Sequence, residues 1–353
     1  MARLFGKDYT RAELLRKTGS ISQLGGTKLV ELCDGNERGT RAVEFRTGSG
    51  FNFTVLADRG LDISSAEMNG MSLCFRSPTG DVAPQYYQPE HLEWLWGFFG
   101  GLLVTCGLSH AGAPAPEEGH GLHGRYSYTP ARELSFDNRW EGDDYIMSVS
   151  GTVRETRFFG ANLVLRRTIT AKLGERRLFI RDELTNEAFE SAPHLILYHI
   201  NPGFPVVDEG SELLSPTIEA EPRDDEARAE AESYNKFHAP RPGYKEKCYF
   251  HRMKPAPDGS VTSALVNRQN FGVYVKYKYA QLPHYVEWKM MGEGAYVVGM
   301  EPANAKLLLR AELRKRGMLP ILAPGERRLY ELEIGVVSGP DEVAALRKLT
   351  AIR

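Results

Sequence analysis

The chain has 353 residues, 42% of them hydrophobic and 25% charged, as in ordinary globular proteins with one large β domain or two smaller ones. Lys and Arg number 44 against 46 Asp and Glu, which offers no basic face for nucleic acid or for an anionic membrane. The longest apolar run, residues 94–106, is too short for a bilayer span, which needs roughly 20 residues.

The N-terminus lacks the apolar stretch of a signal peptide. The four cysteines are widely spaced and form no metal or redox motif, so we expect buried, reduced thiols. Together these features predict a cytoplasmic protein.

A short helix is expected near the start, because Thr10 and Glu13 form a capping box and Gly19 closes the segment. Residues 1–20 are therefore an N-terminal helix and lead-in. From there apolar residues alternate with period two, which is typical of half-buried strands. Strands are predicted at residues 28–33, 42–46, 51–56, 103–106, 132–136, 144–154, 163–172, 177–184, 193–200, 247–252, 261–267, 271–278, 284–289, 295–300, 306–313 and 328–336.

Two segments interrupt or end this pattern. Residues 208–247 are acidic and then proline-rich, which predicts a surface excursion with a solvated charged face. Residues 338–353 are predicted as a C-terminal helix, with Pro340 in its first turn. No change of composition and no repeat divides residues 1–353, so we expect a single domain. The fold class is all-β, a large antiparallel two-sheet β-sandwich with a few short helices.

Glu301 is the first candidate for chemistry. It follows an apolar run and precedes Pro302, which cannot continue a sheet ladder, so we expect Glu301 to be the last residue of a buried strand. A carboxylate there could act as a catalytic base, or it could cap a loop or pair with an arginine. Trp288, on the preceding strand, could stack on a sugar ring or fill the core.

Two histidine motifs are further candidates. His120, His123 and Arg125 lie in a glycine-rich segment that could form a polar pocket wall or a loop with incidental histidines. His199 and Asn201 end an apolar strand and would point the same way from it, although His199 could also be a core histidine. Arg59 lies in a charged tight turn. No nucleotide-binding, serine-hydrolase or H-E-x-x-H motif is present.

Several of these motifs occur together, in order, in one known superfamily. They are Leu122–Arg125, Tyr198–Gly203, Glu301–Pro302 and Leu322–Glu326. On them the chain resembles the aldose 1-epimerase (galactose mutarotase-like) superfamily. Asp58–Asp62 and Thr105–Leu108 resemble a bacterial branch of uncharacterised epimerase-like proteins within it. The resemblance extends roughly from Val55 to the last strand.

The resemblance implies a cofactor-free sugar epimerase, most simply a mutarotase that interconverts anomers by acid–base ring opening. It implies Glu301 as general base, His199 as general acid and His123 as a further histidine at the sugar, and these three are our catalytic candidates. Arg59, Arg125, Asn201, His120 and Trp288 are candidate substrate-binding residues. The sequence around His199 departs from the usual mutarotase motif, which leaves the substrate open. We expect Glu301 ionised and the imidazole charged, each through the other's proximity.

Two alternatives remain open from the sequence. His120, His123, His199 and Glu301 could ligate a divalent metal in a keto-sugar isomerase or epimerase. The chain could also be a non-catalytic sugar-binding protein, because a fold alone does not establish activity. In each case the expected partner is a small-molecule sugar rather than nucleic acid or a membrane. The sequence permits a homodimer but does not decide it, and it does not show whether the sugar is neutral, acidic or phosphorylated.

Overall fold

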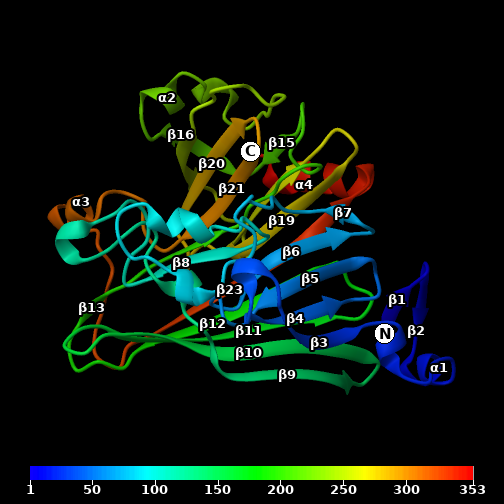
Figure 1. Ribbon diagram of the computed structural model, residues 1–353. Coiled ribbons are helices and arrows are strands. Elements are labelled where there is room, and N and C mark those ends of the chain that lie inside the picture. The colour runs from blue at the N-terminus through cyan, green and yellow to red at the C-terminus, as the bar shows by residue number, and fades with distance from the viewer. Residues whose placement is uncertain (353) are drawn as a thin grey trace.

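The computed structural model describes residues 1–352, so only Arg353 of the predicted C-terminal helix lies outside it. Its regular structure is mainly antiparallel β-sheet, arranged as three large open sheets and two two-stranded pairs (Figure 1). The all-β prediction is therefore confirmed.

The eight-stranded sheet consists, from edge to edge, of β15 (Glu212–Leu214), β18 (Ser260–Val266), β19 (Phe271–Lys278), β23 (Arg327–Ser338), β12 (Arg177–Asn186), β11 (Asn162–Lys172), β10 (Asp144–Thr156) and β9 (Arg132–Glu141). The six-stranded sheet consists of β16 (Thr217–Pro222), β17 (Lys247–Met253), β20 (His284–Gly292), β21 (Ala295–Ala303), β14 (Leu195–His199) and β8 (Val104–Leu108). The five-stranded sheet consists of β3 (Gly26–Glu31), β4 (Arg41–Arg46), β5 (Phe51–Leu56), β6 (Asp62–Met68) and β7 (Met71–Ser72).

The two short pairs join β1 (Ala2–Leu4) with β2 (Lys7–Tyr9), and β13 (Ala192–Pro193) with β22 (Ile321–Leu322). The α-helices are α1 (Arg11–Leu15), α2 (Asp225–Arg228), α3 (Arg310–Lys315) and α4 (Pro340–Thr350). The 3₁₀ helices are η1 (Ile21–Gln23), η2 (Gly35–Glu37), η3 (Pro84–Tyr86), η4 (Glu93–Gly97), η5 (Pro116–Glu118), η6 (Tyr126–Tyr128) and η7 (Ala231–Ser233).

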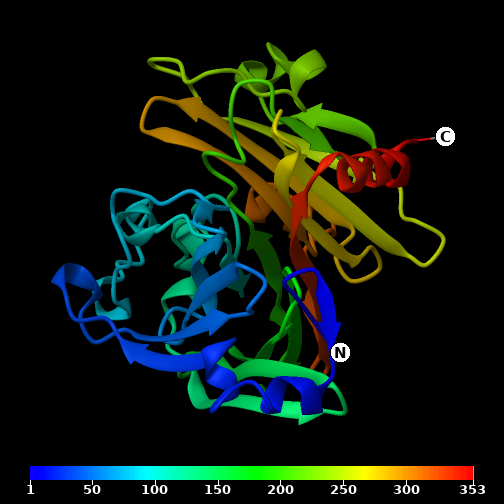
Figure 2. The same cartoon turned by 90° about the vertical axis from the view of Figure 1, so that its right-hand side faces the viewer.

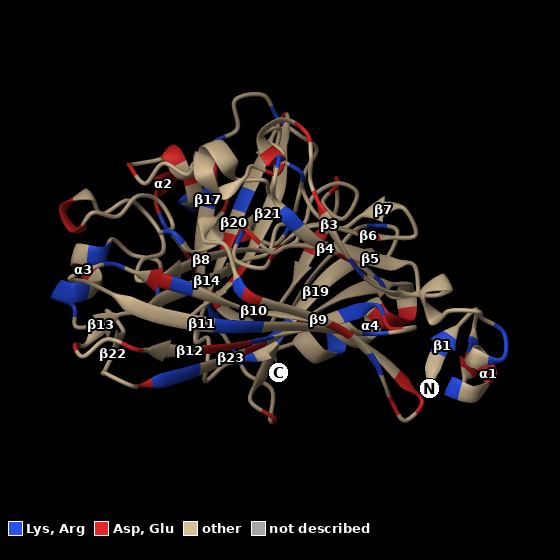
Figure 3. Cartoon of the chain, turned by 60° about the horizontal axis from the view of Figure 1, so that its bottom comes forward, with Lys and Arg blue, Asp and Glu red and all other residues tan. Residues whose placement is uncertain are grey.

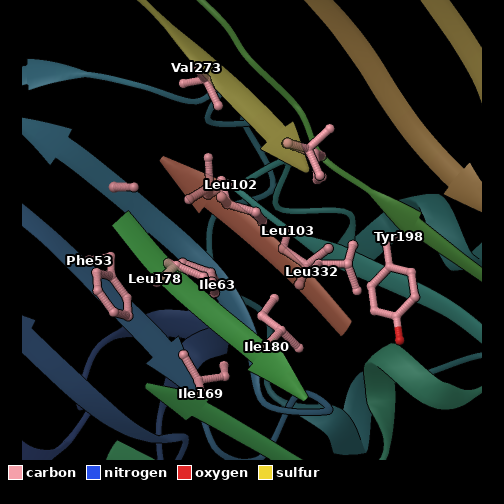
Figure 4. Close-up of a cluster of buried hydrophobic side chains, with 14 of the residues drawn as sticks. Phe53, Ile63, Leu102, Leu103, Ile169, Leu178, Ile180, Tyr198, Val273 and Leu332 are labelled. Atoms are coloured by element: carbon pink, nitrogen blue, oxygen red, sulfur yellow. The ribbon is translucent and has the colours of Figure 1, made fainter. Parts of the chain in front are cut away.

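The main core lies between the inner face of the eight-stranded sheet and the other two large sheets. Figure 4 shows Phe53 of the five-stranded sheet and Ile180 of the eight-stranded sheet pointing into one cluster. Tyr198 and Met300 bring the six-stranded sheet into the same cluster. The molecule is thus layered as a sandwich, but the layer opposite the eight strands is divided into two sheets.

The predicted two-sheet count is therefore not exact. The five- and six-stranded sheets meet at β6 and β8, where an isolated bridge pairs Ile63 with Leu103. The chain between β7 and β8 leaves the layer as a long irregular segment, so no continuous ladder joins them. On the outer face of the eight-stranded sheet, α4 packs over β15, β18 and β23 (Figure 2).

Some of the predicted helical features agree with the structure, whereas one of the predicted strands does not. The Thr10–Glu13 capping box and the C-terminal helix are confirmed. The first helix ends at Leu15 rather than at Gly19, and strands β1 and β2 precede it. The predicted strand 306–313 is wrong: residues 310–315 form helix α3 instead. Arg310 is held there by Glu118 and by the carbonyl of Ser109. The leucines before the helix lack the alternation that would mark a strand.

The acidic excursion is more ordered than its composition suggested. Residues 208–247 contribute β15 and β16 to two different sheets and also contain α2. Residues of both charge signs are interspersed along the chain (Figure 3). Among residues 1–352 no helix has the length and apolarity to span a bilayer. All four cysteines are free; Cys74, Cys106 and Cys248 are buried as predicted, whereas Cys33 is exposed.

Candidate active site

A single row of residues crosses one face of the six-stranded sheet and ends at the candidate catalytic pair. Glu221 pairs with Phe250, Phe250 with Val286, and Val286 with Glu301. Residues directly opposite one another in antiparallel strands point to the same face. His199 continues the row on β14, because its neighbours pair Leu197 with Ala303 and Ile200 with Met300.

Pro302 explains why the ladder opens at this point. The sequence had suggested that Glu301 is the last residue of its strand. This is wrong, because strand β21 continues to Ala303. Ile200 and Met300 exchange backbone hydrogen bonds, and the next such position would pair Tyr198 with Pro302. The nitrogen of Pro302 has no proton to donate, so regular pairing between β14 and β21 is interrupted beside Glu301 and His199.

The two side chains of the pair meet directly. Nε2 of His199 lies 3.2 Å from Oε1 of Glu301, and both residues are almost completely buried. Within residues 1–352, neither Oε1 of Glu301 nor Nδ1 of His199 has a hydrogen bond of good geometry. Buried polar atoms are rarely left without partners, so these two are available to a ligand.

Gly299 makes room for this carboxylate. A Cβ atom at position 299 would lie 2.2 Å from Oε1 of Glu301 and 2.9 Å from Cβ of Trp288. Glycine is therefore required here for Glu301 to keep its place.

His123 reaches the same site from the loop that follows β8. Its ring centre lies 5.8 Å from that of His199 and 4.9 Å from that of Trp94. The backbone N–H of Gly112 points at its Nδ1 from 3.4 Å. His123 has a left-handed φ of 58°, and such backbone conformations cluster at functional sites. The following residue must be glycine, because a Cβ at Gly124 would lie 2.4 Å from the carbonyl oxygen of His110.

These three side chains line a pocket of about 470 Å³. Trp94 and Phe98 come from the segment around η4, and their rings stack at 5.2 Å. Phe98 also contacts the rings of His199 and Trp288. The pocket is thus concave and largely apolar, with a few convergent polar groups, as is usual for small-molecule sites.

Burial sets the protonation states of the pair. Burial raises the pKa of Glu301 well above its usual value, and Glu246 adds to this. Burial lowers the pKa of His199 to about 4, with Asn201 acting in the opposite direction. Burial therefore acts against the expected ionised carboxylate and charged imidazole. Desolvation penalises both charged forms, so burial favours the neutral pair, with its proton on Glu301.

The excursion supplies the polar rim of the pocket. Glu246 accepts hydrogen bonds from Nε1 of Trp288 at 2.8 Å and from Arg223 at 3.0 Å. Arg223 also binds Asp224 at 2.8 Å and approaches the Sγ of Cys248 at 3.0 Å. Arg223 is the cation in the pocket lining, and carboxylates already neutralise it.

Not all of the predicted site residues come together. Glu301, His199, His123 and Trp288 line the pocket. Arg59, Arg125, Asn201 and His120 do not.

Arg59 is fully buried and donates to the carbonyls of Ser127, Val82 and Gly97, so its assignment as a substrate ligand is corrected to a structural anchor. Asn201 is buried as well and donates to the carbonyls of Gly100 and His199, which fixes the end of β14.

The other two residues lie beside the pocket region without lining it. Arg125 is exposed, with its guanidinium 5.7 Å from the ring centre of Tyr87. His120 stacks on His110 at 4.9 Å. We therefore withdraw both as direct substrate ligands of this pocket.

Sequence reasoning missed Arg223 and Glu246, because nothing in an acidic, proline-rich stretch shows which charges turn inward. It also missed the anchor beneath His199. Fully buried Arg167 binds Asp62 at 3.0 Å and Asp182 at 2.7 Å, and Asp182 accepts from the hydroxyl of Tyr198 at 2.7 Å. This network fixes the residue next to His199.

The geometry of the donor atoms decides the metal-site alternative. His120 lies apart from His123, His199 and Glu301. Among the described residues, no three His, Cys, Asp or Glu side chains are arranged to hold a metal ion. The donor set does not fit a metal, and we derive no metal-assisted step.

The fold is that of the aldose 1-epimerase and galactose mutarotase-like proteins. A Klebsiella pneumoniae protein described as a "putative aldose 1-epimerase" is 24% identical, with a TM-score of 0.88 over 94% of this chain and 89% of that one. The galactose 1-epimerase of Lactobacillus acidophilus is 14% identical, with a TM-score of 0.59 over 89% of this chain and 100% of that one. A galactose mutarotase-like protein of Clostridium acetobutylicum is 12% identical, with a TM-score of 0.58 over 90% of this chain and 100% of that one.

Residues 37–336 match the family model described as "Domain of unknown function (DUF4432)", and the chain belongs to that family. No curated protein matches the chain significantly in sequence.

Proposed function

We propose that the protein is a mutarotase, which interconverts the anomers of a sugar by opening and reclosing its ring. The observation that carries the proposal is the buried pair of Glu301 and His199, 3.2 Å apart in an aromatic-walled pocket with unsatisfied polar atoms. The likeness in fold to epimerases supports the reaction class but not the substrate.

The pair holds one transferable proton, which burial favours on Glu301. Its transfer to Nε2 of His199 gives a carboxylate beside an imidazolium. Glu301 then takes the proton of the anomeric hydroxyl, while His199 gives its proton to the ring oxygen. The bond between the anomeric carbon and the ring oxygen breaks, and the anomeric carbon becomes a carbonyl.

Rotation about the adjacent carbon–carbon bond presents the other face of the carbonyl. Reclosure reverses the proton transfers, so the pair returns to its starting state. Each acid or base group of this kind contributes about 10²- to 10⁴-fold. His123 and Trp288 orient the ring, His123 by hydrogen bonding and Trp288 by contact with its apolar face.

The test is an NMR exchange experiment on aldoses, ketoses, uronates and sugar phosphates. We expect the protein to accelerate exchange between the anomers of at least one class, and Glu301→Gln to abolish the acceleration. Binding of a sugar without accelerated exchange would instead support the non-catalytic alternative. No binding and no exchange for any of the four classes would refute a sugar function.

A further inference from the structure

A second, smaller pocket adjoins the candidate active site on the same face of the sheet. It has a volume of about 270 Å³, and Val286 lines both pockets. Val286 is also the residue paired directly with Glu301. The boundary between the two pockets therefore lies one strand away from the catalytic pair.

The residues of the second pocket continue the rows of the first. On β17, Cys248 lines the first pocket and Phe250 lines the second. On β20, Trp288 lines the first and His284 lines the second. Residues that are two or four positions apart share one face of a strand. From Trp288 to His284 the sheet extends roughly 13 Å, which exceeds the length of one pyranose ring.

The chemistry of the second pocket suits a neutral polyhydroxyl ligand. Lys306 binds Glu221 at 2.6 Å, and Arg252 binds Glu219 at 3.2 Å, so its positive charges are already matched. Paired charged groups and the half-buried imidazole of His284 can exchange hydrogen bonds with hydroxyls without leaving a charge unpaired.

We propose that this pocket is a subsite for a second sugar ring, and that the substrate is a neutral reducing oligosaccharide. Its reducing-end ring lies at Glu301 and His199. Its next ring lies against Lys306, whose Nζ is 5.0 Å from the centre of the Phe250 ring, between Glu221 and His284. The proposal rests on the proposed mutarotase function, because it takes the orientation of the substrate from the catalytic pair.

The test compares exchange of glucose with exchange of maltose, cellobiose, lactose and melibiose, which all carry glucose at the reducing end. We expect kcat/KM for at least one disaccharide to exceed that for glucose about tenfold or more. In Glu221→Gln and Lys306→Met this ratio should fall towards one. The matched control is Glu226→Gln, which breaks the exposed Glu226–Lys245 pair outside both pockets and should keep the ratio. Equal or slower exchange for all four disaccharides would overturn the subsite.

Binding of methyl glycosides tests the subsite separately from the proposed mutarotase function, because the rings of methyl glycosides cannot open. Tighter binding of methyl maltoside, cellobioside, lactoside or melibioside than of methyl glucoside, lost in Lys306→Met, would support the subsite even if no sugar were exchanged. Exchange of monosaccharides with no preference for any disaccharide would refute the subsite and leave the mutarotase intact.

Discussion

The six-stranded sheet carries two histidine–glutamate pairs of equal separation, one on each face. His199 and Glu301 are 3.2 Å apart on the pocket face, and His251 and Glu287 are 3.2 Å apart on the other. Glu287 follows Val286 directly on β20, and so points away from the pocket. The contacts around each pair, rather than the pair itself, decide what it can do.

The second pair, called the sealed pair below, has no exposed side-chain surface, although His251 is among the residues that line the second pocket. The side chains of His251 and Glu287 are fully buried, and Nδ1 of His251 is 2.9 Å from Oγ1 of Thr217. Tyr234 and Tyr285 enclose the imidazole edge-on at 5.3 Å each. The Oε1 atom of Glu287 lacks a hydrogen-bond partner, as does that of Glu301. The first pair differs because Nδ1 of His199 has no partner and because both of its residues line the 470 Å³ pocket. We infer that the first pair serves chemistry and the second holds β16, β17 and β20 together.

The largest expected effect on anomer exchange comes from replacing the glutamate of each pair with glutamine. Glu301→Gln should slow anomer exchange by at least about 10²-fold, because the amide can neither give nor take the proton. Glu287→Gln should leave exchange unchanged. NMR exchange rates and the free energy of unfolding would be measured for both variants. Equal losses of exchange in the two would show that the pairs do not differ in role.

Changes to the sealed pair should instead lower the free energy of unfolding. His251→Ala removes the partner of a buried carboxyl, which should lower the free energy of unfolding by about 2 kcal/mol or more. Glu301→Gln should have a far smaller effect, since burying Glu301 already costs stability. Urea denaturation followed by tryptophan fluorescence would measure both. A His251→Ala variant as stable as wild type would contradict the structural role.

A second change acts on the open pair through the backbone. Gly299→Ala places a methyl group 2.2 Å from Oε1 of Glu301, so the carboxyl must move. Displacement of a catalytic group by about 1 Å can cost on the order of 10²-fold in rate. Gly19→Ala is the matched control, because nothing lies within 4 Å of a Cβ at position 19. Exchange rates in Gly299→Ala equal to those in the control would show that the position of Glu301 is not critical.

The pH profile provides a smaller but specific test of the neutral pair. Because burial lowers the pKa of His199 to about 4, activity should persist below pH 6 and fall only as the pH approaches 4. Below that value both groups carry protons and the pair has no base. At high pH the proton of Glu301 is lost and the pair has no acid. Exchange rates from pH 3.5 to 10 should therefore be bell-shaped, and an acid limb near 6.5 would indicate a solvated imidazole.

Much of this arrangement could be predicted from local sequence. The period-two pattern gives most of the strands, and the histidine and Glu-Pro motifs give Glu301, His199 and His123. The rest depends on packing that one sequence does not display. The charged turn at Arg59 looks the same whether its guanidinium faces solvent or three buried carbonyls. Likewise, alternation shows that Glu287 and Glu301 lie on buried strands, but not which of them faces a cavity.

The smallest expected effect comes from a substitution that leaves both pairs intact. It changes only the polar rim of the pocket that holds Glu301 and His199. Glu246→Gln removes one of the two carboxylates that neutralise Arg223, while the amide oxygen can still accept from Trp288. The freed positive charge should attract an anionic sugar. We expect kcat/KM for glucuronate relative to glucose to rise about fivefold, equivalent to roughly 1 kcal/mol for a partly exposed pair.

Salt dependence identifies the cause of that shift. If the gain comes from uncompensated charge on Arg223, it should shrink as ionic strength rises from 0.01 to about 1 M, because screening shortens the reach of the charge. Glu226→Gln removes a carboxylate from the same excursion outside the pocket, and so controls for net charge. If kcat/KM for glucuronate relative to glucose rises in both variants, the effect comes from long-range attraction. If kcat/KM for glucuronate relative to glucose rises in Glu246→Gln alone, selection by charge occurs at the rim of the pocket that holds Glu301 and His199. The sealed pair has no such rim.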